Sequence, residues 1–191
     1  MVGMNKSMII VDDFYDNVDQ VREYALNKTF NIKGNYPGYR TEAEDVRQHN
    51  YLRIFFEDNI VQKKITYWPR EYNTAYQITN KEDKTWIHHD ETQWAAVIYL
   101  TPNAPIESGT GIYKHKNSNI YRWDGIKKST SDFNHSDVVK NLDEWEQINF
   151  IGNIYNRLVV YDGYLYHRSV LAGFGENKQT GRLFQTFFFN T

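Results

Sequence analysis

The residues best suited to chemistry form a short polar cluster near the middle of the chain. His88 and Asp90 are separated by a single residue. In an extended segment side chains alternate between two faces, so His88 and Asp90 project from the same side, about 7 Å apart along the chain. An imidazole and a carboxylate at this spacing can occupy adjacent positions on one metal ion. The candidate for the third ligand is His167, which lies much further along the chain.

The alternation leaves two alternatives open. His89 and Glu91 repeat the pattern on the opposite face, and periodicity alone does not decide which face points inward. A His-x-Asp match is also short, and a solvated His–Asp pair on the surface would produce it without any metal. We predict that His88, Asp90 and His167 converge on one metal, while His89 and Glu91 do not.

Two histidines and one carboxylate on one face of a metal ion are typical of non-haem Fe(II) oxygenases. Such a ligand set leaves coordination positions open for a cosubstrate and for dioxygen. The sequence contains no cysteine, which excludes disulfides, thiolate nucleophiles and cysteine-based zinc sites. Histidine, aspartate and glutamate are therefore the residues to consider as metal ligands.

A second polar group stands in the aromatic segment 181–190. Arg182 lies at the start of this segment, and Thr186 follows four residues later, on the same face of a strand. An arginine in a core strand needs a carboxylate partner, which it can hold with two parallel hydrogen bonds. A dicarboxylate cosubstrate would supply one, with its other end on the metal. A pair with an internal Asp or Glu, or simple exposure at the strand start, is equally compatible with the sequence.

These residues must be positioned by the surrounding elements, and the N-terminal third predicts two helices. A first helix is expected over residues 18–27, where apolar residues recur at helical spacing. Residues 41–44 have the form of a capping box and predict a second helix that ends near residues 61–64. The predicted apolar stripe of the second helix comprises Val46, Tyr51, Ile54 and Phe55.

From residue 67 onward the segments become short, aromatic and β-branched, with Gly, Asn, Asp and Pro between them. This pattern is typical of an antiparallel sandwich or barrel. Strands are expected at 72–79, 84–89, 94–101, 111–115, 145–150, 157–161, 164–170 and 181–190, besides a short N-terminal strand at 8–11. Residues 116–141 are polar and too long for a plain hairpin loop. We expect this insertion to border the mouth of the site and to govern substrate choice, with a spacer at the far end as the alternative.

The order of these parts resembles the Fe(II)/2-oxoglutarate-dependent dioxygenases, most closely their prolyl-hydroxylase-like branch. The resemblance covers about residues 72–190. Its parts, in chain order, are His88-x-Asp90, the strand 95–100, the turn and strand 109–113, the segment 156–161, His167, and Arg182 with Thr186. It implies that His88, Asp90 and His167 bind Fe(II), and that Tyr99, Arg182 and Thr186 hold the far carboxylate of 2-oxoglutarate.

The chain also departs from that family's pattern. The doubled histidine at 88–89 is less usual than a small residue between the ligands. The stretch from His167 to Arg182 is longer than is common, which predicts an extended hairpin loop over residues 173–180. Residues 11–15 and 36–40 resemble a small group of such oxygenases found in phage and marine bacteria, which implies no particular substrate.

From this resemblance we expect one domain over residues 1–191: a helical N-terminal flank over 1–66 and a double-stranded β-helix (jelly roll) core over 67–191, mainly β with flanking helices. The expected activity is that of a dioxygenase, most simply a hydroxylase, acting with dioxygen on a small-molecule or peptide substrate. A non-enzymatic jelly roll that binds a ligand, and a cupin-type metal protein with another reaction, are the alternatives.

Charge and hydropathy limit the partners. The formal net charge is −2, which provides no strong field for nucleic acid or for an anionic membrane and so disfavours a nucleic-acid substrate. The longest wholly apolar run, residues 94–100, is far too short to span a bilayer. The N-terminus lacks the apolar core of a signal peptide, so a cytoplasmic location is expected. The oligomeric state is left open.

Overall fold

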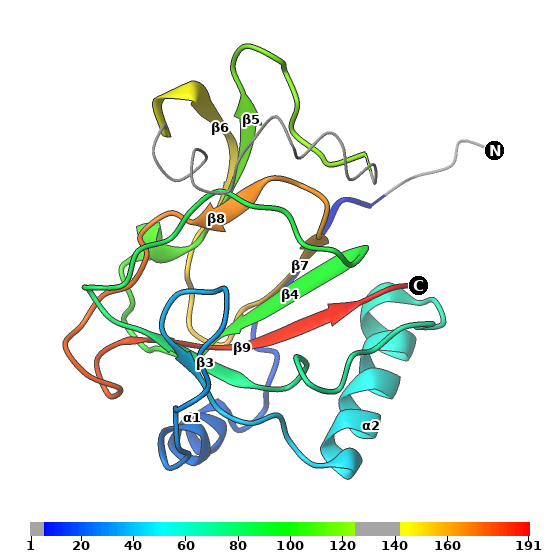
Figure 1. Cartoon of the computed structure of the whole chain (residues 1–191). Helices are drawn as coiled ribbons and strands as arrows, with labels where there is room; N and C mark the ends of the chain where they lie inside the picture. Colours follow the sequence, from blue (N-terminus) through cyan, green and yellow to red (C-terminus); the bar gives the residue numbers. More distant parts are fainter. Residues whose placement is uncertain (1–5, 125–141) are drawn as a thin grey trace.

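The computed structural model describes residues 6–124 and 142–191. Two antiparallel sheets face each other, and two helices cover the outer face of the larger sheet (Figure 1). The larger sheet contains, in spatial order, β1 (Met8–Val11), β7 (Leu158–Asp162), β4 (Trp94–Tyr99), β9 (Arg182–Phe189), β3 (Tyr76–Thr79) and β2 (Tyr39–Arg40). The smaller sheet contains β6 (Trp145–Ile151), β5 (Thr110–His115) and β8 (His167–Ser169). This is the predicted jelly-roll architecture, mainly β with flanking helices.

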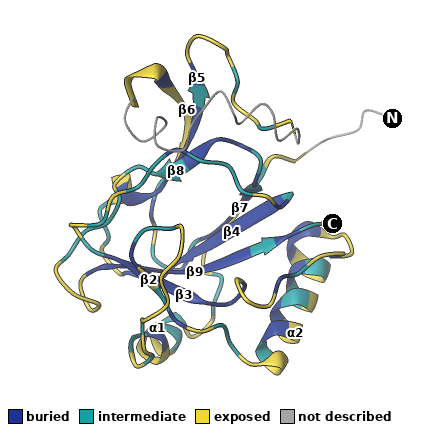
Figure 2. Cartoon of the chain, in the orientation of Figure 1, coloured by how far each residue is buried: buried dark blue, intermediate teal, exposed yellow. Residues whose placement is uncertain are grey.

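The central strands of the larger sheet are buried on both faces, which explains their almost continuous apolar sequences. In β4, Ala96 and Ile98 pack toward the helices, whereas Val97 and Tyr99 face the smaller sheet. The strand β9 follows the same alternation, so Arg182 and Phe184 are on the inner face. Figure 2 shows these central strands as the most deeply buried part of the chain. The space between the two sheets is therefore where inward-facing polar residues of β9 meet those of the smaller sheet.

The helices seal the other face of the larger sheet. The first helix, α1, spans Val18–Leu26, close to its predicted bounds. The second, α2, spans Val46–Phe55 and continues as a π-helical stretch over Phe56–Val61. Phe56 is fully buried and lies with its ring centroid 4.9 Å from that of Phe187 on β9. In the described ranges, no helix is long and apolar enough to cross a membrane.

The start of α2 was predicted wrongly, and the error has a physical cause. The helix begins after Asp45, whose carboxylate accepts a hydrogen bond from the Gln48 amide at 2.9 Å. The hydroxyl of Thr41, predicted to cap the helix, instead accepts a hydrogen bond from the Tyr76 amide of β3 at 3.1 Å. The capping-box residues 41–44 therefore precede the helix, and Thr41 is bonded to the larger sheet.

The predicted apolar stripe of α2 is wrong at three of its four positions, and only Phe55 packs against the core. Tyr51 is 61% exposed, and Val46 and Ile54 are about half exposed. The buried positions are Leu52 and His49. The ring of His49 lies between the Trp68 indole N–H, at 3.1 Å from Nδ1, and the Thr74 hydroxyl, at 3.1 Å from Nε2. Burial lowers its pKa, so the neutral imidazole is the form that these two partners hold.

Two extended segments also differ from the prediction. Residues 84–89 were expected to form a strand, but they form only a single bridge, between His88 and His167. The short strand β2 was not predicted. It directly follows residues 33–38, whose Gly and Pro content is typical of a loop. It pairs antiparallel with β3, with Arg40 opposite Gln77. Both differences concern segments that line the space between the sheets.

The revised burial of α2 predicts the effects of two neighbouring substitutions. Leu52→Ala should lower the free energy of unfolding by about 2–5 kcal/mol, because Leu52 is 1% exposed and its loss leaves a cavity against the sheet. Tyr51→Ala should change it by less than about 1 kcal/mol, because this side chain is mostly in solvent. Urea denaturation of both variants checks the difference. If both variants lost the same unfolding free energy, Tyr51 would be a buried position of α2, as predicted from the sequence.

Candidate metal centre

Two histidines far apart in sequence are joined by a reciprocal pair of backbone hydrogen bonds. The amide of His88 donates to the carbonyl of His167 at 3.0 Å, and the amide of His167 donates to the carbonyl of His88 at 2.7 Å. Residues that face each other in an antiparallel bridge carry their side chains on the same side. The two imidazole rings accordingly lie with their centroids 4.4 Å apart.

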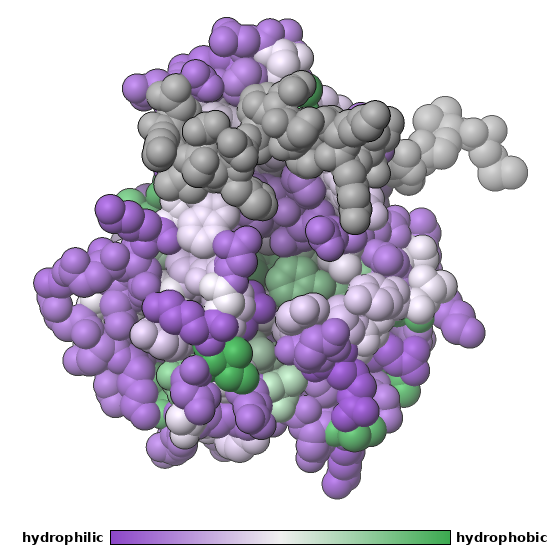
Figure 3. All heavy atoms as spheres, in the orientation of Figure 1, coloured by the Kyte–Doolittle hydropathy of each residue, from purple (hydrophilic) through white to green (hydrophobic). Residues whose placement is uncertain are grey.

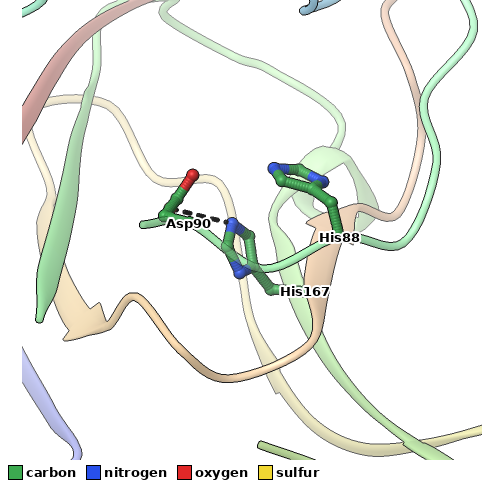
Figure 4. A group of neighbouring side chains, drawn as sticks. All are labelled: His88, Asp90 and His167. Carbon is green, nitrogen blue, oxygen red and sulfur yellow. Dashed lines mark ion pairs between the residues drawn. The ribbon is translucent and has the colours of Figure 1, made fainter. Parts of the chain in front are cut away.

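Asp90 enters this cluster from the same segment. Its amide donates to the carbonyl of Gly163 at 2.7 Å, which ties the segment to the turn after β7. A Cβ at position 163 would lie 2.3 Å from the Thr92 carbonyl oxygen, so only glycine allows this approach. One ligand atom from each of His88, Asp90 and His167 lies within 4.8 Å of the others, and the three side chains point toward a common volume (Figure 4).

The backbone determines which ring nitrogens are available. The Nδ1 atom of His88 lies 3.0 Å from the carbonyl oxygen of Trp86, and that of His167 lies 2.8 Å from the carbonyl oxygen of Leu165. A carbonyl only accepts hydrogen bonds, so each Nδ1 carries the proton and each Nε2 keeps its lone pair. This is the outer-shell arrangement that orients metal-binding histidines.

The electrostatics of the cluster favour a bound cation. Burial raises the pKa of Asp90 and lowers that of His167 well below its usual value. The contact of 3.4 Å between His167 Nε2 and Asp90 Oδ2, dashed in Figure 4, is therefore not an ion pair, because His167 is neutral. Asp90 Oδ2 is buried without a hydrogen-bond partner. Buried polar groups of this kind are costly unless something satisfies them, and a metal ion would.

His89 and Glu91, the alternative pair, do not join the cluster. The ring of His89 stacks on Trp123 with centroids 4.5 Å apart and an angle of 11° between the planes. Its Nδ1 lies 2.9 Å from the carbonyl oxygen of Asp90, and its ring also meets the edge of Tyr166. The structure thus brings together the three residues predicted as ligands.

A cavity of about 580 Å³ extends from this cluster between the two sheets. Arg182 and Thr186 both line it, on the face of β9 that their spacing predicts. Arg182 is almost wholly buried, and its Nε donates to the carbonyl of Ser108 at 3.0 Å. In the described part of the chain, no carboxylate lies within ion-pair distance of it. The internal Asp or Glu partner considered from the sequence is therefore not found there.

The other predicted cosubstrate contacts are Tyr99 and Thr186; Thr186 lines the cavity four residues along β9 from Arg182, whereas Tyr99 is fully buried beside Arg182. The hydroxyl of Tyr99 shares a hydrogen bond of 2.8 Å with that of Thr110, which lines the cavity. The Arg182 guanidinium lies 5.5 Å from the centroid of the Tyr99 ring. The hydroxyl of Thr186 donates to the carbonyl of Tyr72 at 3.4 Å.

Sequence reasoning missed two charged residues of the cavity: Arg168, which lies on β8, and Arg40, which reaches the cavity from β2. The only indication in the sequence was that Arg40 belongs to the segment 36–40, which resembles a group of oxygenases. A two-residue strand is too short to show an alternating pattern. Of the polar segment 116–141, residues 125–141 lie outside the described residues. Its first part runs beside the site, where the amide of Trp123 donates to the Tyr164 carbonyl at 2.7 Å. The expected role of this insertion in substrate choice stays a prediction.

The comparisons with known proteins identify the family of the chain and its fold. The sequence matches the family described as "Family of unknown function (DUF6445)" over residues 1–189. No curated protein matches it. Nothing in these comparisons supports the narrower grouping with oxygenases of phage and marine bacteria.

Solved structures of oxygenases share the fold. HygX from Streptomyces hygroscopicus, with nickel, 2-oxoglutarate and hygromycin B bound, is 10% identical, with a TM-score of 0.59 over 96% of this chain and 82% of that one. A prolyl-4-hydroxylase from Pseudomonas putida is 13% identical, with a TM-score of 0.52 over 97% and 93% of the two chains. The α-ketoglutarate-dependent carbocyclase SnoK from nogalamycin biosynthesis is 11% identical, with a TM-score of 0.57 over 96% and 79%. At these identities the likeness establishes the double-stranded β-helix fold.

The unsatisfied carboxylate predicts opposite effects of Asp90→Asn on stability and on metal binding. Removing a buried charge should raise the unfolding free energy of the metal-free protein by about 1 kcal/mol. Wild-type protein should gain about 2.7 kcal/mol when Mn(II) is present at 100 times its Kd, whereas Asp90→Asn should gain almost nothing at that concentration. Denaturation with and without Mn(II) measures both effects. His89→Ala is the matched control and should keep the metal-dependent gain; its loss would place His89 in the site.

Proposed function

This chain belongs to the DUF6445 family, and we propose that it is an Fe(II)- and 2-oxoglutarate-dependent oxygenase that hydroxylates a C–H bond of a small molecule or peptide. The observation that carries the proposal is the juxtaposition, in one cavity, of the His88–Asp90–His167 cluster and the buried Arg182. The cluster by itself would also suit a metal protein with a different reaction, and a buried arginine by itself could bind any anion. Together they match the two ends of a 2-oxo dicarboxylate.

The donor set favours iron. Two imidazole nitrogens and one carboxylate suit Fe(II), whereas Mg(II) and Ca(II) prefer oxygen ligands throughout. The lone pairs of both Nε2 atoms and the unpartnered Asp90 Oδ2 are the three donors. When bound, Fe(II) supplies the activation of dioxygen, with 2-oxoglutarate converted to succinate and carbon dioxide while the substrate C–H becomes C–OH.

The chain's own residues bind and orient the cosubstrate. Arg182 is a buried guanidinium whose Nε is held by the Ser108 carbonyl. A carboxylate is the partner that its planar donors fit best. Tyr99 and Thr186 are proposed to add hydroxyl contacts to that carboxylate. In HygX, nickel and 2-oxoglutarate are bound together, which supports the same pairing of metal and cosubstrate in a protein of this fold.

The cavity also has the means to exclude water from the reacting groups. Phe184, Val97 and Tyr161 line it, and the ring of Tyr161 lies with its centroid 4.7 Å from that of His167. Val97 and Phe184 belong to the apolar cluster between the two sheets. Such walls keep the local dielectric low and strengthen charge interactions inside the cavity. They would favour binding of the charged cosubstrate at Arg182.

An anaerobic titration tests the proposal. Addition of 2-oxoglutarate to Fe(II)-loaded protein should produce a visible metal-to-ligand charge-transfer band, because the 2-oxo acid chelates the metal directly. Dioxygen admitted afterwards should yield succinate. Metal binding without the band would favour a cupin-type metal protein. Absence of metal binding as well would favour a non-enzymatic jelly roll.

The role proposed for Arg182 predicts a selective defect. Arg182→Leu should weaken 2-oxoglutarate binding more than tenfold, since a charge-assisted bidentate pair contributes about 1.5–3 kcal/mol. The Kd for Mn(II) should stay unchanged, because Arg182 does not touch the metal ligands. Isothermal titration of Mn(II)-loaded protein with 2-oxoglutarate provides the measurement. Arg47→Gln, on the exposed face of α2, is the control. Unchanged affinity in Arg182→Leu would remove Arg182 from the cosubstrate site.

A further inference from the structure

Of the three arginines that line the cavity, Arg40 stands on the same sheet as Arg182 and is not used by the proposed metal and cosubstrate sites. It stands at the end of β2, next to a turn that only glycine can make. Gly38 has φ of +72°, and a Cβ there would lie 1.9 Å from the Ile78 carbonyl oxygen. Arg40 pairs across the sheet with Gln77, and Gln77 pairs with Phe184 of β9. These cross-strand neighbours share one face, and all three line the cavity.

The side chain of Arg40 is held in one orientation. Its Nε donates to Gln77 Oε1 at 2.7 Å, and Gln77 Nε2 in turn donates to the Pro37 carbonyl at 2.7 Å. The guanidinium lies 3.8 Å from the centroid of the Tyr36 ring and 5.7 Å from that of Phe188. A planar cation between two aromatic rings has little freedom to turn. The two Nη ends are therefore presented in a fixed position.

This arrangement leaves the positive charge without a counter-ion from the protein. Across residues 6–124 and 142–191, no carboxylate lies within ion-pair distance of Arg40, and Gln77 Oε1 is the one acceptor that its guanidinium finds. Asp90 is close enough to act on it electrostatically, but its carboxylate is committed to the metal cluster. A partly buried guanidinium without an acidic partner favours an anion, since part of its charge is desolvated and otherwise uncompensated.

The charge balance of the loaded cavity shows where that anion comes from. If the proposed function holds, the two charges of Fe(II) and the one of Arg182 are balanced by Asp90 and the two carboxylates of 2-oxoglutarate. Two further charged residues of the cavity wall, Arg168 and Glu91, are opposite in sign and balance each other, which leaves the positive charge of Arg40. With metal and cosubstrate in place, the substrate is the molecule left to supply an anion.

We propose that Arg40 is the specificity-determining residue that binds an anionic group of the substrate, a carboxylate or a phosphate. The neighbouring wall is aromatic, with Tyr36, Tyr72 and Trp86 lining the same cavity. Figure 3 shows an apolar ring inside a recess that mainly hydrophilic residues surround. The substrate class is thus a small amphipathic acid, whose anion pairs with the Arg40 Nη atoms and whose apolar body lies along the aromatic wall.

The test uses three small aromatic probes: a carboxylate, the neutral amide of that carboxylate, and a phosphate ester. They are 3-phenylpropionate, its neutral amide, and phenyl phosphate. Each is titrated calorimetrically into Mn(II)-loaded protein saturated with 2-oxoglutarate, so that Arg182 is already occupied. The wild-type protein should bind at least one anion ten or more times tighter than the amide. The anion that binds with the higher affinity shows whether the substrate's anionic group is a carboxylate or a phosphate.

Variants at position 40 complete the design. Arg40→Gln should remove the preference for the anion, Arg40→Lys should keep part of it, and Arg47→Gln should keep all of it. Circular dichroism of each variant establishes that it is folded. Equal affinity of the anions and the amide for wild type, or no binding of any probe, overturns the proposal. A loss of 2-oxoglutarate affinity in Arg40→Gln with unchanged probe affinity also overturns it, because Arg40 would then serve the cosubstrate.

The two proposals fail in different ways. If wild-type protein does not bind 2-oxoglutarate, the proposed function fails. The probes are then titrated into the Mn(II) protein alone, and an Arg40-dependent preference for the anion still supports the anion site. If 2-oxoglutarate binds equally to wild type and Arg40→Gln while the anion preference is absent, the inference about Arg40 alone fails.

Discussion

The paired backbone hydrogen bonds between His88 and His167 are the constraint on which the candidate site depends. His88 lies in the connection between β3 and β4 of the larger sheet, and His167 lies in β8. The bonds therefore attach this connection to the smaller sheet. Asp90, two residues further on, is then placed by its bond to Gly163. The three donors are brought together by main-chain contacts made during folding. Ordering them therefore adds little to the entropic cost of binding a metal.

The distribution of charge over the cavity follows from the larger sheet. Arg182 on β9 and Arg40 on β2 stand on the same face, with β3 between their strands. Each guanidinium is anchored through Nε, one by a backbone carbonyl and the other by a glutamine side chain. These two cations on the wall that the larger sheet forms give the cavity positive charge at separate points, to which Arg168 of the smaller sheet adds another. Ligands with negative charge at separate points fit this pattern.

Local sequence patterns predicted side-chain positions correctly where the backbone is regularly extended. They failed where a residue distant in sequence determines which hydrogen bonds or strand pairs form. His88 and Asp90 share a face because alternation holds in any extended segment, even though no strand forms there. Thr41 matched a helix cap, yet its hydroxyl accepts a hydrogen bond from the Tyr76 amide, 35 residues away. The sequence around Thr41 does not indicate this distant donor. Arg40 was missed because its cavity position arises from a two-residue pairing with β3. Such short pairings are set by the neighbouring strand rather than by the sequence of the segment itself.

The unpartnered oxygen of Asp90 has a consequence for the lifetime of the protein. A buried carboxylate that is satisfied only by a bound cation makes the metal-free chain less stable than the loaded one. At metal concentrations 100 times the Kd, the unfolded fraction falls about 100-fold. Proteases act on the unfolded fraction, so the amount of this protein in a cell would follow the supply of metal. Degradation would then remove the chains that have not been loaded.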